Sequence, residues 1–87
     1  MKNYITKTDV ININKMLGED GIVREMGTLE HACQDMKRLP EMIATDHPFV
    51  DRNKRTAFVV ATMIEKGETA DRIIRENKRW LKILGRV

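Results

Sequence analysis

The sequence holds little of several residue types, and each shortage excludes a class of protein. A single cysteine, Cys33, occurs among the 87 residues, which excludes a disulfide framework and a zinc site made of cysteines alone. Aromatic residues make up only 5% of the chain, so the core must be built mainly from aliphatic side chains and methionine. No apolar run approaches the roughly 18 residues of a membrane span, and residues 1–10 contain no apolar segment typical of a secretion signal. We therefore expect a cytoplasmic protein without a membrane partner, in which Cys33 is a small buried thiol.

The remaining composition is typical of one small globular domain. Hydrophobic residues make up 41% of the chain and charged residues 33%, a balance that favours a folded chain over a disordered one. A length of 87 residues is enough for one core, so we expect a single domain over residues 1–87. The net charge of +3 is too small to indicate a nucleic-acid partner by itself.

The first predicted helix lies before the glycines near residue 20. Thr8 is the expected N-cap, with Asp9 in the first turn, where a negative charge favours the helix dipole. Between this N-cap and Gly18, three apolar residues fall at helical spacing, namely Val10, Ile13 and Leu17. Gly18 is the expected end of the helix. Residues 18–27 contain three glycines and three acidic residues, and they are predicted to form a loop.

Two helices are expected between this loop and the next proline pair. Thr28 is the predicted N-cap of the first of them. Its apolar face consists of Leu29, Ala32, Cys33 and Met36. Pro40 then either begins a new helix or kinks a continuing one, because proline fits the first helical turn and disrupts an interior. A short helix should run to Asp46, since His47 precedes proline and is disfavoured in the α conformation.

The last two predicted helices begin at about Asn53 and at Thr69. The first ends at Gly67, and its apolar face consists of Ala57, Val60, Ala61 and Ile64. The second has Ile73, Trp80 and Leu84 on one stripe, flanked by Ile74 and Leu81. Its opposite side carries Arg72, Arg75, Lys78, Arg79, Lys82 and Arg86. These patterns predict an all-α fold of four or five short helices packed around the helix that contains Ala57 and Ile64.

One segment, residues 47–57, concentrates side chains that can do chemistry just before an apolar helix. Backbone N–H groups at the start of a helix favour anions, and Lys54 and Arg55 add positive charge there. Cations at that end are unfavourable for the helix dipole, so their presence favours a bound anion such as phosphate. His47 is the candidate general base because its side chain titrates near neutral pH. Asp51 is the candidate ligand of a divalent cation such as Mg²⁺.

Other residues of the segment suit a structural role. Phe49 and Val50 are expected to anchor the loop in the core, and Asn53 can hydrogen-bond its own loop and fix its shape. Together the segment supplies a base, a metal ligand, an anion-binding backbone and a cationic clamp, as phosphoryl transfer requires. The alternative interpretation is a solvated turn in which Asp51 simply pairs with Arg55.

The segment resembles the signature of the Fic/Doc family, especially its Doc (death-on-curing) branch. The family pattern is H-x-F-x-D/E-G/A-N-G/K-R. Six residues match it in register, namely His47, Phe49, Asp51, Asn53, Lys54 and Arg55. Residues 10–14 and 21–32 also look like the usual opening of Doc sequences, so the resemblance covers most of the chain, while only residues 47–57 are specific.

The resemblance implies a role for each matching residue. His47 would take a proton from a hydroxyl group of a protein target, and Asp51 would bind Mg²⁺ at the nucleotide phosphates. Asn53 would shape the anion site, and Arg55 would hold phosphate. Lys54 stands where AMP-transferring Fic proteins usually carry glycine and Doc proteins carry lysine, which favours transfer of phosphate from ATP over transfer of AMP.

The resemblance also implies partners. The target of Doc is a translation elongation factor, so a translation factor is one expected target. The chain contains no S/T-x-x-x-E-G/N inhibitory motif, and restraint would therefore come from a separate antitoxin, as in toxin–antitoxin pairs.

The sequence departs from the family pattern in two places that matter for activity. Arg52 stands where the family has glycine or alanine, and its long side chain could either obstruct the phosphate site or add another clamp. The family places a β-hairpin flap, which docks the target by strand addition, before the signature loop. Here residues 33–46 fill that space, and their pattern predicts helix.

Two alternatives to a transferase follow from these observations. The missing flap and Arg52 favour a binding or regulatory module that kept the fold and lost turnover. The basic last helix, with six basic and two acidic residues between Thr69 and Val87, is the feature that favours nucleic-acid binding. A solvated amphipathic helix explains that charge equally simply, so a nucleic-acid partner is the less favoured expectation.

Overall fold

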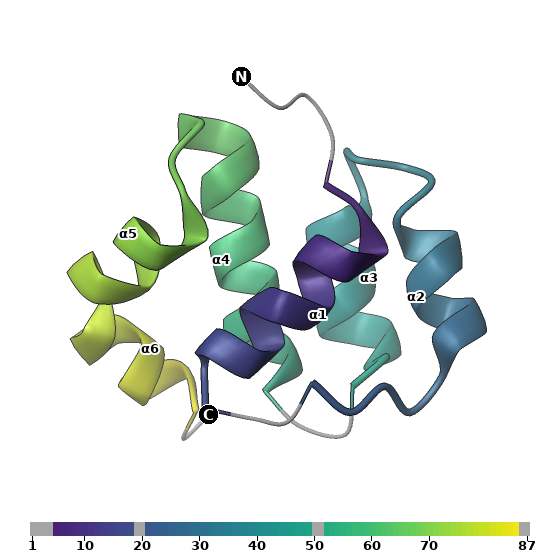
Figure 1. The fold of residues 1–87 in the computed structure, drawn as a ribbon, viewed down its shortest axis with the longest axis horizontal. Coiled ribbons are helices and arrows are strands. Elements are labelled where there is room, and N and C mark those ends of the chain that lie inside the picture. Colours follow the sequence, from purple (N-terminus) through teal and green to yellow (C-terminus); the bar gives the residue numbers. More distant parts are fainter. Residues whose placement is uncertain (1–4, 19–20, 50–51, 86–87) are drawn as a thin grey trace.

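The computed structural model describes residues 5–18, 21–49 and 52–85, and these ranges form six helices (Figure 1). The helices are α1 (Lys7–Met16), α2 (Met26–Ala32), α3 (Leu39–Asp46), α4 (Asn53–Lys66), α5 (Ala70–Glu76) and α6 (Lys78–Leu84). The predicted all-α class is confirmed. The only β-type pairing among the described residues is an isolated antiparallel bridge between Val23 and Phe49.

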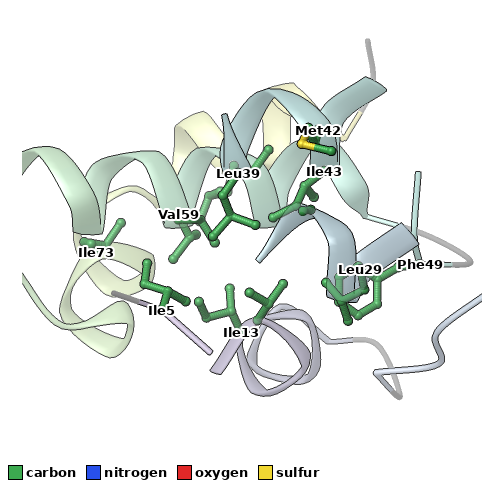
Figure 2. Close-up of a cluster of buried hydrophobic side chains, with 14 residues drawn as sticks. Ile5, Ile13, Leu29, Leu39, Met42, Ile43, Phe49, Val59 and Ile73 are labelled. Atoms are coloured by element: carbon green, nitrogen blue, oxygen red, sulfur yellow. The ribbon is translucent and has the colours of Figure 1, made fainter. Parts of the chain in front are cut away.

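Helix α4 lies at the centre of the fold. It packs against α1 and α3 on one side and against α5 and α6 on the other, and α2 packs against α3 (Figure 1). The core is almost entirely aliphatic, as the composition predicts. Figure 2 shows part of it, including Ile13 from α1 and Leu39 and Ile43 from α3. Its buried members are Ile5, Val10, Ile13, Leu29, Ala32, Leu39, Met42, Ile43, Phe49, Ala57, Val59, Val60, Ile73 and Leu81.

The start of α1 differs from the prediction by two residues. Thr6, not Thr8, is the N-cap, and its hydroxyl accepts a hydrogen bond from the Asp9 N–H at 3.2 Å. The Asp9 carboxylate in turn accepts from the Thr6 N–H at 2.9 Å, which completes a capping box. This reciprocal pair requires a three-residue spacing, which Thr6 has with Asp9 and Thr8 does not.

The second helix is shorter and begins earlier than predicted. Glu25 precedes its first residue, so Thr28 lies inside α2 and does not cap it. Cys33 ends α2, and Met36 lies in a turn beyond it, although Met36 still packs against the core. Pro40 occupies the first turn of α3, which resolves the two options for this proline in favour of a new helix.

The boundaries of α4 match the prediction, but its buried face is rotated. The helix begins at Asn53, and Gly67 ends it in the left-handed region at φ 69°. Its buried residues are Thr56, Ala57, Val59 and Val60. Ile64, which was expected to face inward, is 45% exposed. Other helices pack against α4 on opposite sides. Its buried residues therefore do not lie on the single face that the sequence predicts.

The single helix predicted after Thr69 is divided at Asn77, and this division raises the helix count to six. The backbone of Asn77 leaves the helical region at φ −124°, and its side-chain Nδ2 donates to the Ile73 carbonyl at 2.8 Å. The seven-residue spacing from Ile73 therefore no longer places Trp80 in the core. Trp80 is 45% exposed and meets Phe58 edge-on, with ring centroids 6.3 Å apart. Leu81 takes the buried position instead.

Cys33 lies in the turn after α2 and is half-buried. Burial raises the pKa of its thiol above the ordinary value, and the negative charge of Asp9 raises it further. Cys33 is therefore a weakly ionised packing residue, in line with the expectation from the sequence.

Candidate functional site

Residues 47–57, called the signature segment below, run from the end of α3 into α4. Left-handed residues stand at both ends of the connection between the two helices, residues 47–52. His47 ends α3 at φ 49° and Arg52 precedes α4 at φ 61°. These are the only non-glycine residues with positive φ in the described chain. An L-residue other than asparagine, aspartate or histidine rarely adopts this conformation. Glycine adopts positive φ without steric cost, so arginine at position 52 carries a strain that glycine would not.

A pair of hydrogen bonds between Asn53 and Phe49 fixes the shape of the loop. The Phe49 N–H donates to Asn53 Oδ1 and Asn53 Nδ2 donates to the Phe49 carbonyl, both at 3.0 Å. Phe49 is 1% exposed and belongs to the core cluster. The expected anchoring role of Phe49 and the expected loop-shaping role of Asn53 are both confirmed.

Residues 24 and 25, just before α2, contact the loop through hydrogen bonds that no motif in the sequence indicates. Arg24 donates through Nη2 to the His47 carbonyl at 2.8 Å and to the Asp46 carbonyl at 3.3 Å. The backbone N–H groups of Arg24 and Glu25 both donate to the Pro48 carbonyl, at 2.7 and 3.2 Å. The backbone of His47 is therefore held on two sides, while its side chain lies at the surface.

A buried polar pair secures the first turn of α4. The Thr56 hydroxyl donates to the Arg52 carbonyl at 2.8 Å and accepts from Asn14 Nδ2 at 3.2 Å. Asn14 and Thr56 are 1% and 0% exposed, so each hydrogen bond stabilises the fold. Asn14 was not singled out from the sequence, although it lies four residues after Val10, on the apolar face of α1. A polar residue on such a face was the available signal.

An open pocket of about 520 Å³ lies where α4 begins, between the C-terminal end of α1 and helices α5 and α6. Figure 1 shows these ends of α1 and α4 and helix α6 in the same region of the molecule. Four basic side chains line it, namely Arg52, Arg55, Lys78 and Lys82. Its apolar lining consists of Met16, Leu17, Ile74 and Leu81. No acidic residue is among the described residues that line it.

Arg55 reaches across this region toward the end of α6. Its guanidinium lies so close to Gly85 that a Cβ on that glycine would overlap Nη2 and Cζ of the arginine. The Nε atom of Arg55 is buried and has no hydrogen-bond partner within the described part of the chain. A buried guanidinium nitrogen without an acceptor is unfavourable.

The structure brings together some of the predicted site residues and separates others. Arg52 and Arg55 line the same pocket. Lys54 is exposed, His47 is exposed, and neither lines that pocket. The predicted metal ligand Asp51 and its neighbour Val50 lie outside the described residues. Across the described chain, no three histidine, cysteine, aspartate or glutamate side chains gather as a metal site.

The helix predicted over residues 33–46 is confirmed only in its second half. Residues 33–38 form turns and residues 39–46 form α3, which packs along α4. Arg24 binds the end of α3 through the two carbonyls described above. The part of this segment next to residue 47 is therefore a helix, α3, that contributes Leu39, Met42 and Ile43 to the core.

The chain was compared with family models, curated proteins and solved structures, and none of them matches. Among the helices of the described ranges, none combines the length and the apolar character needed to cross a membrane.

Proposed function

We propose that this protein is a Doc-like transferase that moves a phosphate from ATP to a hydroxyl group of a protein target. The observation that carries the proposal is the convergence of Arg52 and Arg55, both from the signature segment, on one pocket at the start of α4 whose described lining contains no acidic residue. A phosphate there would meet the positive end of a 14-residue helix as well as two guanidinium groups.

His47 is the proposed general base. Its side chain is exposed at the end of α3, where a hydroxyl group of another protein can reach it. In the proposed reaction, His47 accepts the proton of that hydroxyl as its oxygen bonds to the γ-phosphorus. The bond from the γ-phosphorus to the bridging oxygen breaks, and ADP leaves. The hydrogen bonds from Arg24 to the His47 carbonyl and from Asn53 to Phe49 hold the loop in place during this step.

The phosphates have several proposed ligands in this chain. Arg55 would hold phosphate oxygens through its guanidinium group, Asn53 would keep the loop in shape, and Lys54 would add charge at the helix start. Mg²⁺ held by Asp51 would neutralise phosphate oxygens when bound. Arg52 lines the pocket with Arg55, which supports its interpretation as a clamp over its interpretation as an obstruction.

The resemblance to Doc also supplies the proposed setting. We infer a cytoplasmic protein whose target is a translation factor and whose activity is restrained by a separate antitoxin. Transfer of AMP is the less favoured reaction, because Lys54 matches the Doc pattern.

The test is incubation of the protein with γ-labelled ATP, Mg²⁺ and cell extract. A labelled protein band is expected with the wild type and not with His47→Ala. His47→Asn is the better matched variant, because asparagine adopts the left-handed conformation of residue 47 readily and removes the base. Equal labelling by wild type and both variants, or no labelling by any of them, would contradict the proposal.

A second candidate is a nucleotide-binding module without turnover. Two observations favour it, namely the helical segment in place of the flap and the absence of His47 from the lining of the basic pocket. This candidate predicts heat of ATP binding in calorimetry with no label transferred to any protein. Transfer that depends on His47 would exclude it.

A further inference from the structure

Two lysines of α6 share the basic pocket, although they lie outside the signature segment. Lys78 and Lys82 are four residues apart, so they occupy the same side of the helix on successive turns. The division of the chain at Asn77 sets the direction of α6, which packs against α4. As a result, these lysines line one pocket with Arg52 and Arg55, which are more than 20 residues earlier in the sequence.

Among the described residues, four cationic side chains line the pocket and no acidic side chain does. Four cationic side chains in one concavity repel one another, and the two from the start of α4 also lie at the unfavourable end of a helix dipole. Arg55 adds a buried Nε atom with no acceptor among the described residues. A ligand with several negative charges would relieve the repulsion among these cations.

The volume of the pocket and its apolar lining restrict the chemical class of that ligand. A volume of about 520 Å³ falls within the roughly 300–1,000 Å³ of small-molecule sites. Met16, Leu17, Ile74 and Leu81 provide an apolar surface beside the cations. A ligand that is polyanionic at one end and flat and weakly polar at the other fits this combination, as a nucleoside polyphosphate does.

The basic residues of α5 do not join those of the pocket to form a continuous basic surface. Arg72 pairs with Glu76 and Glu68 at 3.2 and 3.6 Å, and Arg75 pairs with Asp71 at 3.4 Å. These carboxylates neutralise the charge of α5 locally. A nucleic-acid backbone needs cations along its length, whereas here Lys78 and Lys82 line one pocket together with Arg55.

We propose that Lys78 and Lys82 bind the polyphosphate of a nucleoside triphosphate, together with Arg52 and Arg55. The inference that this nucleotide is the donor of the transfer reaction rests on the proposed function, while the binding itself does not require turnover. Lys78 and Lys82 are thus nucleotide-binding residues contributed by a helix outside the signature segment.

Calorimetric titration of the full chain tests this assignment, with ATP, AMP, adenosine and tripolyphosphate as probes. Affinity should fall from ATP to AMP, adenosine should show no binding, and tripolyphosphate should bind more weakly than ATP because it lacks the base. Lys78→Ala and Lys82→Ala should each weaken ATP binding about fivefold, as expected for partly exposed charge-assisted contacts. Arg79→Ala is the matched control, because Arg79 is an exposed cation on α6 outside the pocket lining.

The outcomes separate this inference from the proposed function. Failure of wild-type protein to bind ATP, or equal affinities in the lysine variants and Arg79→Ala, would overturn it. Weaker binding of mixed RNA and DNA in all three variants alike, with no ATP binding, would favour nucleic acid instead. Normal ATP binding by His47→Asn together with no labelling of proteins by wild-type enzyme would support the binding site and overturn the transferase.

Discussion

The guanidinium of Arg55, in the first turn of α4, lies directly against the backbone of Gly85 at the end of α6. Gly85 has ordinary helical angles, φ −70° and ψ −12°, so the backbone conformation does not require glycine. The required property is space, because any Cβ would overlap the arginine side chain. This contact links the end of α6 to the residue that the signature pattern assigns to phosphate.

Gly85→Ala should therefore lower the affinity for ATP markedly while changing the free energy of unfolding only slightly. The added methyl group should displace the Arg55 guanidinium and weaken ATP binding several-fold. The free energy of unfolding should change by less than about 1 kcal/mol, because alanine accepts these angles and only the end of a flexible side chain must move. Calorimetry and urea denaturation measure the two effects. Gly27→Ala is the control, since a Cβ there meets no atom within 4 Å, and equal ATP affinity in both variants would contradict the contact.

Arg52→Gly should separate conformational strain from charge. Glycine relieves the positive φ of residue 52, so the free energy of unfolding should rise by about 1 kcal/mol. ATP affinity should fall, because the pocket loses one of its lining cations. Arg52→Asn tolerates the same conformation and also removes the charge, so it should weaken binding to the same extent. Tighter ATP binding in either variant would show instead that Arg52 obstructs the pocket.

Asn53→Ala should loosen the signature loop. The variant loses both hydrogen bonds to Phe49, at a cost of about 1–3 kcal/mol in the free energy of unfolding. Asn53→Asp keeps the acceptor, loses the donor and places a carboxylate against the Phe49 carbonyl, so it should also destabilise the protein. Glu65→Ala, at an exposed site on the same helix, is the control and should stay within about 0.5 kcal/mol of the wild type. Urea midpoints for Asn53→Ala and Glu65→Ala that coincide would contradict the role of Asn53.

Thr56→Val should destabilise the start of α4 although it preserves side-chain shape. Valine cannot donate to the Arg52 carbonyl or accept from Asn14, which should cost about 1–3 kcal/mol. Thr56→Ser keeps both hydrogen bonds and loses one methyl group, worth about 0.8 kcal/mol. Thermal or urea unfolding should therefore rank the proteins as wild type, Thr56→Ser, then Thr56→Val. A serine variant less stable than the valine variant would contradict this account.

The local features of the fold were predictable because they depend on neighbouring residues. Pro48 after His47 and the glycine at Gly67 set helix ends that the structure confirms. The capping box of Thr6 and Asp9 also depends only on a three-residue spacing that the sequence contains, and the prediction of Thr8 as the N-cap was wrong. The break at Asn77 was not predictable from periodicity, because Ile73, Trp80 and Leu84 fit one continuous helix equally well.

Only those contacts of the candidate site that join residues close together in the sequence could be predicted. The hydrogen bonds between Asn53 and Phe49 follow from residues four positions apart. The contact of Arg55 with Gly85 and the sharing of one pocket by Arg55 and Lys78 depend on how α4 and α6 pack. That packing is set by buried residues such as Leu81, whose position changes when the last helix divides. Sequence spacing within one helix carries no information about it.

The most direct test of the central claim compares ATP labelled at the γ-phosphate with ATP labelled at the α-phosphate in the same extract. The account predicts a protein band labelled from γ-labelled ATP only, present with wild type and absent with His47→Asn. Labelling from α-labelled ATP that depends on His47 would show AMP transfer and contradict the assignment of Lys54. The absence of any His47-dependent band with either label would contradict the transferase itself.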